Sequence, residues 1–252
     1  MQQDAAQIGR AVPARMAERL IVALDVPTIA QARDLVAQIG DAAGFYKVGY
    51  WLLYAAGADG LLAEIKAAGK RLFLDAKLHD IGQTVEVGAA RAAERGADLL
   101  TVHAEPAVMR AAMRGAAGSG MMVFGVTVLT SLDDADLAGM GYGMGVAALV
   151  RLRARQAAEA GCHGIIASPQ DSPAALRAAA GAPGLLIATP GVRPLGEAAG
   201  DQKRVATPYE AIVGGADYLV VGRPIIGKAD PAAAARAIVA EMEQAGLGNT
   251  GR

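Results

Sequence analysis

Residues 72–85 read LFLDAKLHDIGQTV. In this stretch an apolar run is followed, within six positions, by four ionisable side chains: Asp75, Lys77, His79 and Asp80. An unpaired buried charge is costly, so such a cluster either neutralises itself or serves chemistry. Strand side chains alternate, so Asp75 and Lys77 share a face while Ala76 points the other way. Asp75, Lys77 and Asp80 could then form a carboxylate–ammonium–carboxylate array that keeps the lysine protonated and able to donate a proton.

A network of salt bridges that ties this strand to its neighbours is the competing interpretation. It loses weight if the cluster lies at the mouth of a barrel, where active sites are found. The small Ala76 and the nearby Gly82 leave room there for a ligand.

A second set of residues could hold a phosphate group. Three stretches contain it: TPGVRP (189–194), GDQKRVATP (200–208) and VVGRPI (220–225). Gly191 and Gly222 permit close approach of the backbone, and Arg193 and Arg223 can each grip phosphate oxygens with two donors. Gln202 could add a neutral donor. For either arginine taken alone, the alternative interpretation is an ordinary solvated loop residue that binds no phosphate.

Eight short β-rich runs would have to position these residues: 20–25, 45–50, 71–76, 98–103, 122–129, 164–168, 185–189 and 218–222. Their nearly continuous apolar character suits parallel strands that are buried on both faces. Ala-rich segments with helical spacing lie between them, as at 28–39, 84–96, 145–161 and 230–246. Eight such units in 252 residues favour a closed barrel over an open sheet, so we expect an α/β fold, a single-domain (β/α)8 TIM barrel.

Polar residues occur in or just after the carboxyl ends of these runs, which in a barrel form one shared mouth: Asp25, Lys47, Asp75, Lys77, His103, Thr130, Ser168, Thr189 and Arg223. The long segments 130–145 and 193–207 are candidate lids over that mouth. We expect an N-terminal arm at 1–17, the catalytic barrel at 18–245 and a C-terminal tail at 246–252.

The composition excludes several classes of function. The net charge of −1 provides no electrostatic footprint for nucleic acid or an anionic membrane. The single cysteine, Cys162, rules out an internal disulfide and favours a reducing compartment. We find no signal peptide, no apolar run of the ~18 residues that a membrane span needs, and no metal-ligand spacing. The sequence predicts a cytoplasmic protein without a bound metal.

The motif LDAKLHDIGQTV resembles the D-x-K-x-x-D-I-x-x-T signature of the orotidine 5′-phosphate decarboxylase family. The similarity runs from Leu20 to about Gln244 and includes VALD, YKVG, VTVLTS, TPGVRP, DQKRV and VVGRP in the family's order. It implies decarboxylation of orotidine 5′-phosphate to UMP and carbon dioxide, the last step of UMP synthesis, without a cofactor.

The resemblance also implies roles for the charged residues. Lys77 would protonate C6 of a vinyl carbanion, and Asp75 would lie against the substrate carboxylate or orient Lys77. Lys47 and Asp25 would hold the ribose hydroxyls, and Lys47 would join the charged array. A preorganised cation beside the developing negative charge suits this reaction.

The remaining implied roles concern binding and assembly. Asp80 and Thr84 would reach into the site of a neighbouring subunit, which makes the enzyme a homodimer. Thr130 and Ser131 would meet the pyrimidine, and four residues would grip the 5′-phosphate: Arg193, Gln202, Gly222 and Arg223. The family usually has proline and asparagine where this chain has Gly82 and Gln83, and a bulkier residue than Ala76.

Three other readings stay open. Related Mg²⁺-dependent barrels act on 3-keto sugar phosphates, but they typically place a metal-binding Glu where this chain has Lys47, which would repel the cation. A non-catalytic barrel that binds a nucleotide or sugar phosphate is the second. A phosphate-binding isomerase is the third, and it would need a carboxylate base that Glu105 could supply only awkwardly.

Overall fold

Eight parallel strands close into a barrel, each hydrogen-bonded to the next in chain order and the last to the first, in a computed structural model that describes residues 12–195 and 205–248. The strands are β1 (Leu20–Ala23), β2 (Phe45–Gly49), β3 (Arg71–Leu78), β4 (Leu99–His103), β5 (Met122–Val126), β6 (Gly164–Ile166), β7 (Leu186–Thr189) and β8 (Tyr218–Val221). Seven of the predicted runs contain one of them, and β3 extends two residues beyond the predicted run 71–76. The predicted (β/α)8 barrel is confirmed.

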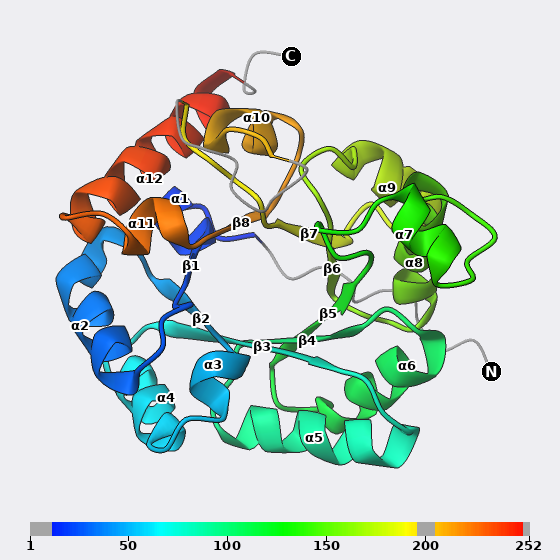
Figure 1. The fold of residues 1–252 in the computed structure, drawn as a ribbon, viewed down its shortest axis with the longest axis horizontal. Helices are drawn as coiled ribbons and strands as arrows, with labels where there is room; N and C mark the ends of the chain where they lie inside the picture. The colour runs from blue at the N-terminus through cyan, green and yellow to red at the C-terminus, as the bar shows by residue number, and fades with distance from the viewer. Residues whose placement is uncertain (1–11, 196–204, 249–252) are drawn as a thin grey trace.

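Helices form an outer ring around the strands (Figure 1). They are α1 (Met16–Arg19), α2 (Ile29–Ile39), the 3-10 helix η1 (Gly40–Ala42), α3 (Tyr50–Leu53), α4 (Ala58–Ala67), α5 (Gly82–Glu94), α6 (Pro106–Gly115), α7 (Asp134–Gly139), α8 (Val146–Glu159), α9 (Pro173–Ala180), α10 (Pro208–Val213), α11 (Arg223–Ile226) and α12 (Pro231–Gly248). None of the helices within the described residues has the length and apolar character to cross a membrane.

The helix boundaries follow local capping chemistry. The side chain of Thr28 accepts a hydrogen bond from the Gln31 backbone at the start of α2, and Thr207 and Glu210 form a reciprocal capping box at the start of α10. The last helix, α12, runs to Gly248, so the first three residues of the expected tail, 246–248, are helical.

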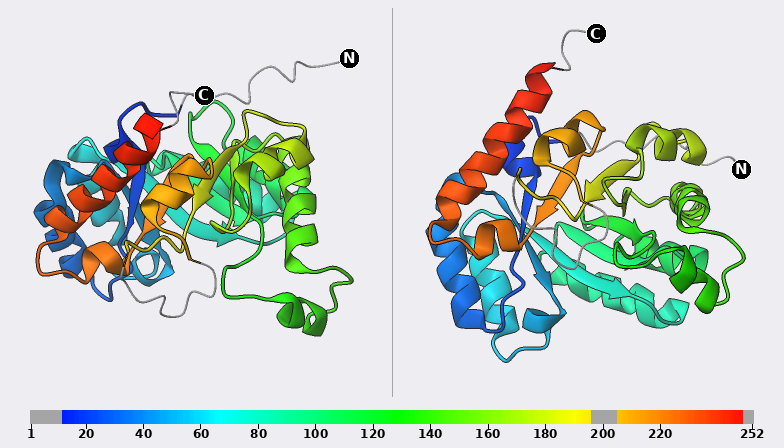
Figure 2. Two further views of the ribbon diagram at one scale, coloured as in Figure 1. Left: turned by 90° about the horizontal axis from the view of Figure 1, so that it is seen from above. Right: turned by 45° about the horizontal axis from the view of Figure 1, so that its top comes forward.

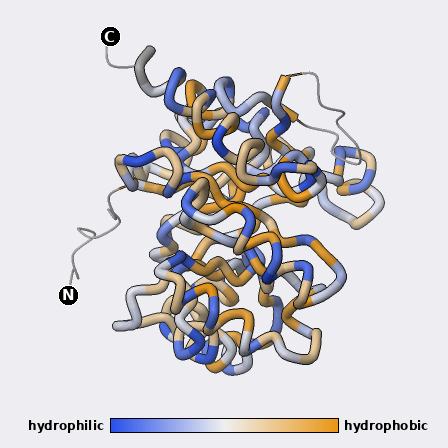
Figure 3. Tube along the Cα trace, turned by 90° about the vertical axis from the view of Figure 1, so that its left-hand side faces the viewer, coloured by the Kyte–Doolittle hydropathy of each residue, from blue (hydrophilic) through white to orange (hydrophobic). Residues whose placement is uncertain are grey.

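Apolar side chains fill two layers. One cluster fills the inside of the barrel, and a larger one lies between the strands and the helices. In Figure 3 the apolar stretches of the trace run through the middle of the molecule. Gly164 on β6 is needed for this packing, because a Cβ there would lie 2.6 Å from the Phe124 ring and 2.5 Å from the Leu186 carbonyl oxygen.

The segment 130–145, a predicted lid, contains the short helix α7, which stands away from the body of the barrel (Figure 2). The predicted run 122–129 is a strand only as far as Val126. Its last apolar residues, Val128 and Leu129, line a cavity instead of continuing the strand pairing. A prediction from apolar character alone therefore extended this strand three residues beyond its observed end.

Candidate active site

A cavity of about 630 Å³ opens at the carboxyl ends of the strands. Its size lies in the range that holds small-molecule ligands, roughly 300–1,000 Å³. Nine of the predicted site residues line it: Asp25, Lys47, Asp75, Lys77, Thr130, Ser131, Arg193, Gly222 and Arg223. The structure therefore brings together residues that are spread over almost two hundred positions of the sequence.

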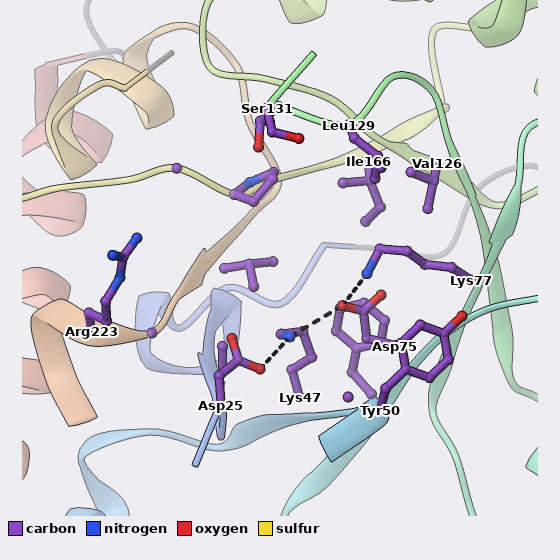
Figure 4. A pocket seen from close by; sticks show the side chains of 18 of the residues that line it. Asp25, Lys47, Tyr50, Asp75, Lys77, Val126, Leu129, Ser131, Ile166 and Arg223 are labelled. Carbon is purple, nitrogen blue, oxygen red and sulfur yellow. Dashed lines mark hydrogen bonds and ion pairs between the residues drawn. The ribbon is translucent and has the colours of Figure 1, made fainter. Parts of the chain in front are cut away.

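Four of these side chains form a row of alternating charge across β1, β2 and β3. The Nζ atom of Lys47 lies 2.9 Å from Oδ1 of Asp25 and 3.2 Å from Oδ2 of Asp75. The same Oδ2 atom of Asp75 lies 2.8 Å from Nζ of Lys77 (Figure 4). We call Asp25, Lys47, Asp75 and Lys77 the charge row. It ends on an ammonium group that faces the cavity.

The two middle members of the charge row are buried, each only 8% exposed. Burial alone would raise the pKa of Asp75, but Lys47, Lys77 and a hydrogen bond from Thr101 outweigh it and lower that pKa. Burial likewise opposes the charge of Lys47, yet Asp75 and Asp25 raise its pKa. Both groups are therefore charged at neutral pH, and the row compensates its own desolvation.

The array that we predicted from spacing, Asp75, Lys77 and Asp80, is not formed within this chain. Asp80 is exposed, and its carboxylate accepts a hydrogen bond from the Ile81 backbone at 2.6 Å. It follows the end of β3 by two residues, so strand alternation no longer directs its side chain. Thr84, in the first turn of α5, is also exposed, and neither residue is among those that line the cavity.

The backbone at Lys77 is unusual. Its φ of 38° is left-handed, and no other non-glycine residue in the described parts of the chain has a positive φ. Such a conformation costs roughly 1–2 kcal/mol and persists only where its surroundings enforce it. Here the pairing of β3 with β4 is irregular: between the pairs Leu74–Leu100 and Leu78–Val102, three residues of β3 lie opposite Thr101 alone.

An apolar wall faces the charge row across the cavity. Val126 and Leu129 come from the end of β5 and the loop after it, and Ile166 comes from β6 (Figure 4). Thr130 and Ser131 follow at the rim, with Thr130 partly buried and Ser131 exposed. This wall suits a flat ring that carries polar groups at its edge, and it keeps the dielectric low beside Lys77.

The predicted phosphate residues lie after β7 and β8, which are neighbours in the barrel. Gly191 has a φ of 77°, a conformation that glycine adopts without strain. Arg193 donates from Nη1 to the Val192 carbonyl at 2.8 Å, and Arg223 is exposed at the opposite end of the cavity from Lys77 (Figure 4). Gln202 lies outside the described residues.

The base of the second predicted lid, 193–207, is closed. Val192 pairs with Ala206 in an isolated bridge, and the Arg193 backbone donates to the Ala206 carbonyl at 2.9 Å. The two ends of this segment therefore lie side by side, whereas its residues 196–204, on which the lid prediction depends, lie outside the described residues.

Two residues at the site were missed by sequence reasoning. Thr101 is fully buried and donates to Asp75 Oδ1 at 2.8 Å, while its Oγ1 accepts from the Lys77 backbone N–H at 3.1 Å. Tyr50 lines the cavity, and its hydroxyl donates to the Ala76 carbonyl. The sequence does not mark a threonine inside a strand or a tyrosine after one as a site residue, because the hydrogen-bond partners of both depend on the register of the strands.

A third group lies beside the site without joining the charge row. His79 and Glu105 approach to 2.9 Å, and the rings of His79 and His103 lie 4.8 Å apart. His103 is half-buried at the end of β4, and burial is the main cause of its lowered pKa. Among the residues that the structure describes, no group of three or more His, Cys, Asp or Glu side chains is arranged to hold a metal ion.

Comparison with known proteins adds an independent observation. The family model described as "Orotidine 5'-phosphate decarboxylase / HUMPS family" matches residues 18–238. A relative from Afipia carboxidovorans, named orotidine 5'-phosphate decarboxylase, is 54% identical over 230 residues, which cover 91% of this chain and 97% of the relative. A relative of the same name from Methylorubrum populi is 56% identical over 226 residues, covering 90% of this chain and 96% of the relative.

A solved structure agrees with these relatives. The crystal structure of orotidine 5'-phosphate decarboxylase from Lactobacillus acidophilus superposes with a TM-score of 0.79 at 34% identity. The match covers 89% of this chain and 99% of that chain.

Proposed function

This chain belongs to the orotidine 5′-phosphate decarboxylase / HUMPS family, and on that premise we propose that it converts orotidine 5′-phosphate to UMP and carbon dioxide, the last step of UMP biosynthesis. The observation that carries the proposal is the charge row, which ends in a cation between a buried carboxylate and an apolar wall. The cytoplasm is the proposed location, and the buried, unpaired thiol of Cys162 supports a reducing compartment.

Lys77 is the proposed catalytic acid. When the bond between C6 and the carboxylate carbon breaks, carbon dioxide leaves and the electron pair stays on C6 as a vinyl carbanion. The ammonium group of Lys77 stabilises this charge and transfers a proton to C6, after which water reprotonates the amine. Asp75 holds Lys77 in place at 2.8 Å before the substrate arrives, so no reorganisation is needed during the reaction.

Asp75 has a second proposed role. A substrate carboxylate that lies near Lys77 also lies near the Asp75 carboxylate, because the two protein groups share one hydrogen bond. Repulsion between the two carboxylates disappears as carbon dioxide forms, so it favours the transition state over the bound substrate. Contacts of the distant 5′-phosphate with Arg193 and Arg223 offset the cost of holding the substrate there.

We further propose a homodimer in which Asp80 and Thr84 complete the site of the neighbouring subunit. Two observations support it: both side chains are exposed, and neither is among the residues that line the cavity of their own chain. The large apolar side chain of Ile81, which follows Asp80 directly, is 72% exposed and suits a subunit contact.

Subunit mixing tests the shared site. Consider a dimer in which one subunit carries Lys77→Ala and the other carries Asp80→Ala. If each site combines Lys77 of one subunit with Asp80 of the other, one of the two sites retains both native residues. A refolded equal mixture should therefore regain about a quarter of wild-type turnover, given random pairing in a two-fold dimer. Two inactive variants that stay inactive when mixed, or a monomeric mass in solution, would contradict the shared site.

The activity itself is tested by the loss of orotidine 5′-phosphate absorbance with purified protein in excess EDTA, beside Lys77→Ala. Turnover that survives the chelator and collapses in the variant supports the proposal. Activity only on a keto-sugar phosphate with added Mg²⁺ would favour the metal-dependent relatives. Binding of UMP with no turnover in either assay would indicate a non-catalytic barrel.

A further inference from the structure

The peptide group between Ala76 and Lys77 is held at both of its polar atoms by side chains of neighbouring elements. Its N–H donates to Thr101 Oγ1 on β4 at 3.1 Å. Its carbonyl oxygen accepts from the hydroxyl of Tyr50, the first residue of α3, which follows β2. The plane of this peptide is therefore set by one side chain from β4 and one from α3.

That plane determines where Lys77 points. Rotation of a peptide group changes the φ of the residue that follows it, here the left-handed φ of 38°. A lysine relaxes from this conformation unless hydrogen bonds maintain it. The Cβ direction of Lys77, and with it the approach of Nζ to the cavity, thus depends on the two hydrogen bonds to the peptide.

Tyr50 is itself held in place. Its ring stacks on the ring of Tyr54 with centroids 5.8 Å apart and an angle of 14° between the planes. Burial raises the pKa of Tyr50, as do Tyr54 and the charge of Asp75, so the hydroxyl stays protonated and remains a donor. Its acceptor is a carbonyl group, so the donor role is the one that matters.

We propose that Tyr50 is a positioning residue for the decarboxylation, and that its hydroxyl aims Lys77 by holding the Ala76–Lys77 peptide in the orientation that the left-handed backbone requires. Thr101 holds the other end of the same peptide but also binds Asp75, whereas the only hydrogen bond described for the Tyr50 hydroxyl goes to this peptide. Tyr50 is therefore the residue through which this effect can be measured separately. The inference depends on the proposed function, because it concerns the catalytic acid of that reaction.

The test is Tyr50→Phe, with Tyr54→Phe as the matched control. Both variants lose one phenolic hydroxyl from the same stacked pair, and no hydrogen bond from Tyr54 Oη to the Ala76–Lys77 peptide is seen in the described structure. We expect Tyr50→Phe to lower kcat about tenfold, the loss of one hydrogen bond expressed in the transition state, with KM within about twofold of wild type. Tyr54→Phe should match wild type, and both variants should melt at the wild-type temperature.

Three results would overturn the inference: an unchanged kcat in Tyr50→Phe, an equal loss in Tyr54→Phe, or a change in KM alone, which would make Tyr50 a substrate contact. A crystal structure of Tyr50→Phe provides a readout that does not depend on activity. We expect the Ala76–Lys77 peptide to turn from its wild-type orientation and the 2.8 Å contact between Lys77 Nζ and Asp75 Oδ2 to lengthen, and an unchanged Lys77 backbone would refute the mechanism. If wild-type protein itself does not turn over orotidine 5′-phosphate, the proposed function fails, and the structure of the variant still decides the role of Tyr50.

Discussion

The two ends of the cavity are built in different ways. At the β3 end, the two middle members of the charge row, Lys47 and Asp75, are buried, and hydrogen bonds join the four members across three strands. At the β7–β8 end, Arg223, the first residue of α11, is exposed and follows Gly222, and Arg193 is partly exposed two residues after Gly191. One end is assembled before a ligand arrives, whereas the other offers positive charge and accessible backbone at the surface.

The contrast matches what each end has to do. A proton must be delivered to one carbon atom, so the acid needs a fixed direction, and fixed dipoles in a dry site are worth more than mobile ones in water. A phosphate dianion is bound through several oxygens, and each planar guanidinium group can donate two hydrogen bonds to them. We therefore expect substitutions at the β3 end to act on kcat and those at the β7–β8 end to act mainly on KM.

The largest effect should come from Lys77→Ala. Removing the acid should lower kcat by about 10⁴-fold or more, at the upper end of what a single general acid contributes. The fold should survive, because Asp75 keeps its ion pair with Lys47 at 3.2 Å. Absorbance assays measure the loss, and a melting curve checks the fold. A variant that retains a tenth of wild-type kcat would refute the role of Lys77.

Asp75→Asn should follow, with kcat lowered about 10³-fold, as for the loss of one preorganised electrostatic group. The change preserves shape but leaves two ammonium groups without their shared carboxylate, so the free energy of unfolding should also fall by about 3 kcal/mol. Urea denaturation measures the second effect. Wild-type stability together with normal turnover would show that the charge row is only a structural salt bridge.

Arg223→Gln probes the other end. The loss of charge-assisted hydrogen bonds to a phosphate should lower kcat/KM by about 50-fold, expressed mainly in KM. Arg223→Lys serves as its control, because it keeps the charge but loses the bidentate grip, and it should fall in between. The contrast between the two ends breaks down if Arg223→Gln lowers kcat as much as Asp75→Asn does.

A smaller difference between the two ends should appear in the pH dependence of the melting temperature. The pKa of Asp75 is lower in the folded protein than in the unfolded chain, so its stabilising contribution is fully present above about pH 4 and is lost as the pH falls through the lower, folded value. Wild type and Asp75→Asn should therefore converge in melting temperature at acid pH. Arg223→Gln should follow the wild-type acid profile, since it removes no carboxylate.

Sequence patterns predicted the fold almost completely, because its signals are local. A buried parallel strand is a continuous apolar run, and the segments between the strands are Ala-rich with helical spacing. The ends of strands were harder to predict. The apolar residues after Val126 line the cavity, and a hydropathy pattern cannot separate a wall residue from a strand residue.

The sequence predicted which residues form the site better than it predicted which of their side chains contact one another. Asp75 and Lys77 share a strand face, so alternation was enough to bring them together. Spacing alone suggested Asp80 as the second carboxylate, but the next partners along the row are Lys47 and Asp25 from other strands. The left-handed Lys77 could not be foreseen, because glycine is the usual signal for that conformation.

The burial of Lys47 and Asp75 in the middle of the charge row has a consequence for the effect of ionic strength. Dissolved ions screen exposed charges over a Debye length of about 8 Å at physiological salt, but they cannot enter between Lys47 and Asp75, whose side chains are 10% and 11% exposed. Raising salt should therefore weaken substrate capture at the arginines while leaving the chemical step almost unchanged. Lys47 and Asp75 therefore serve as each other's counterions inside the barrel, and the salt concentration of the medium affects only the exposed arginine end of the site.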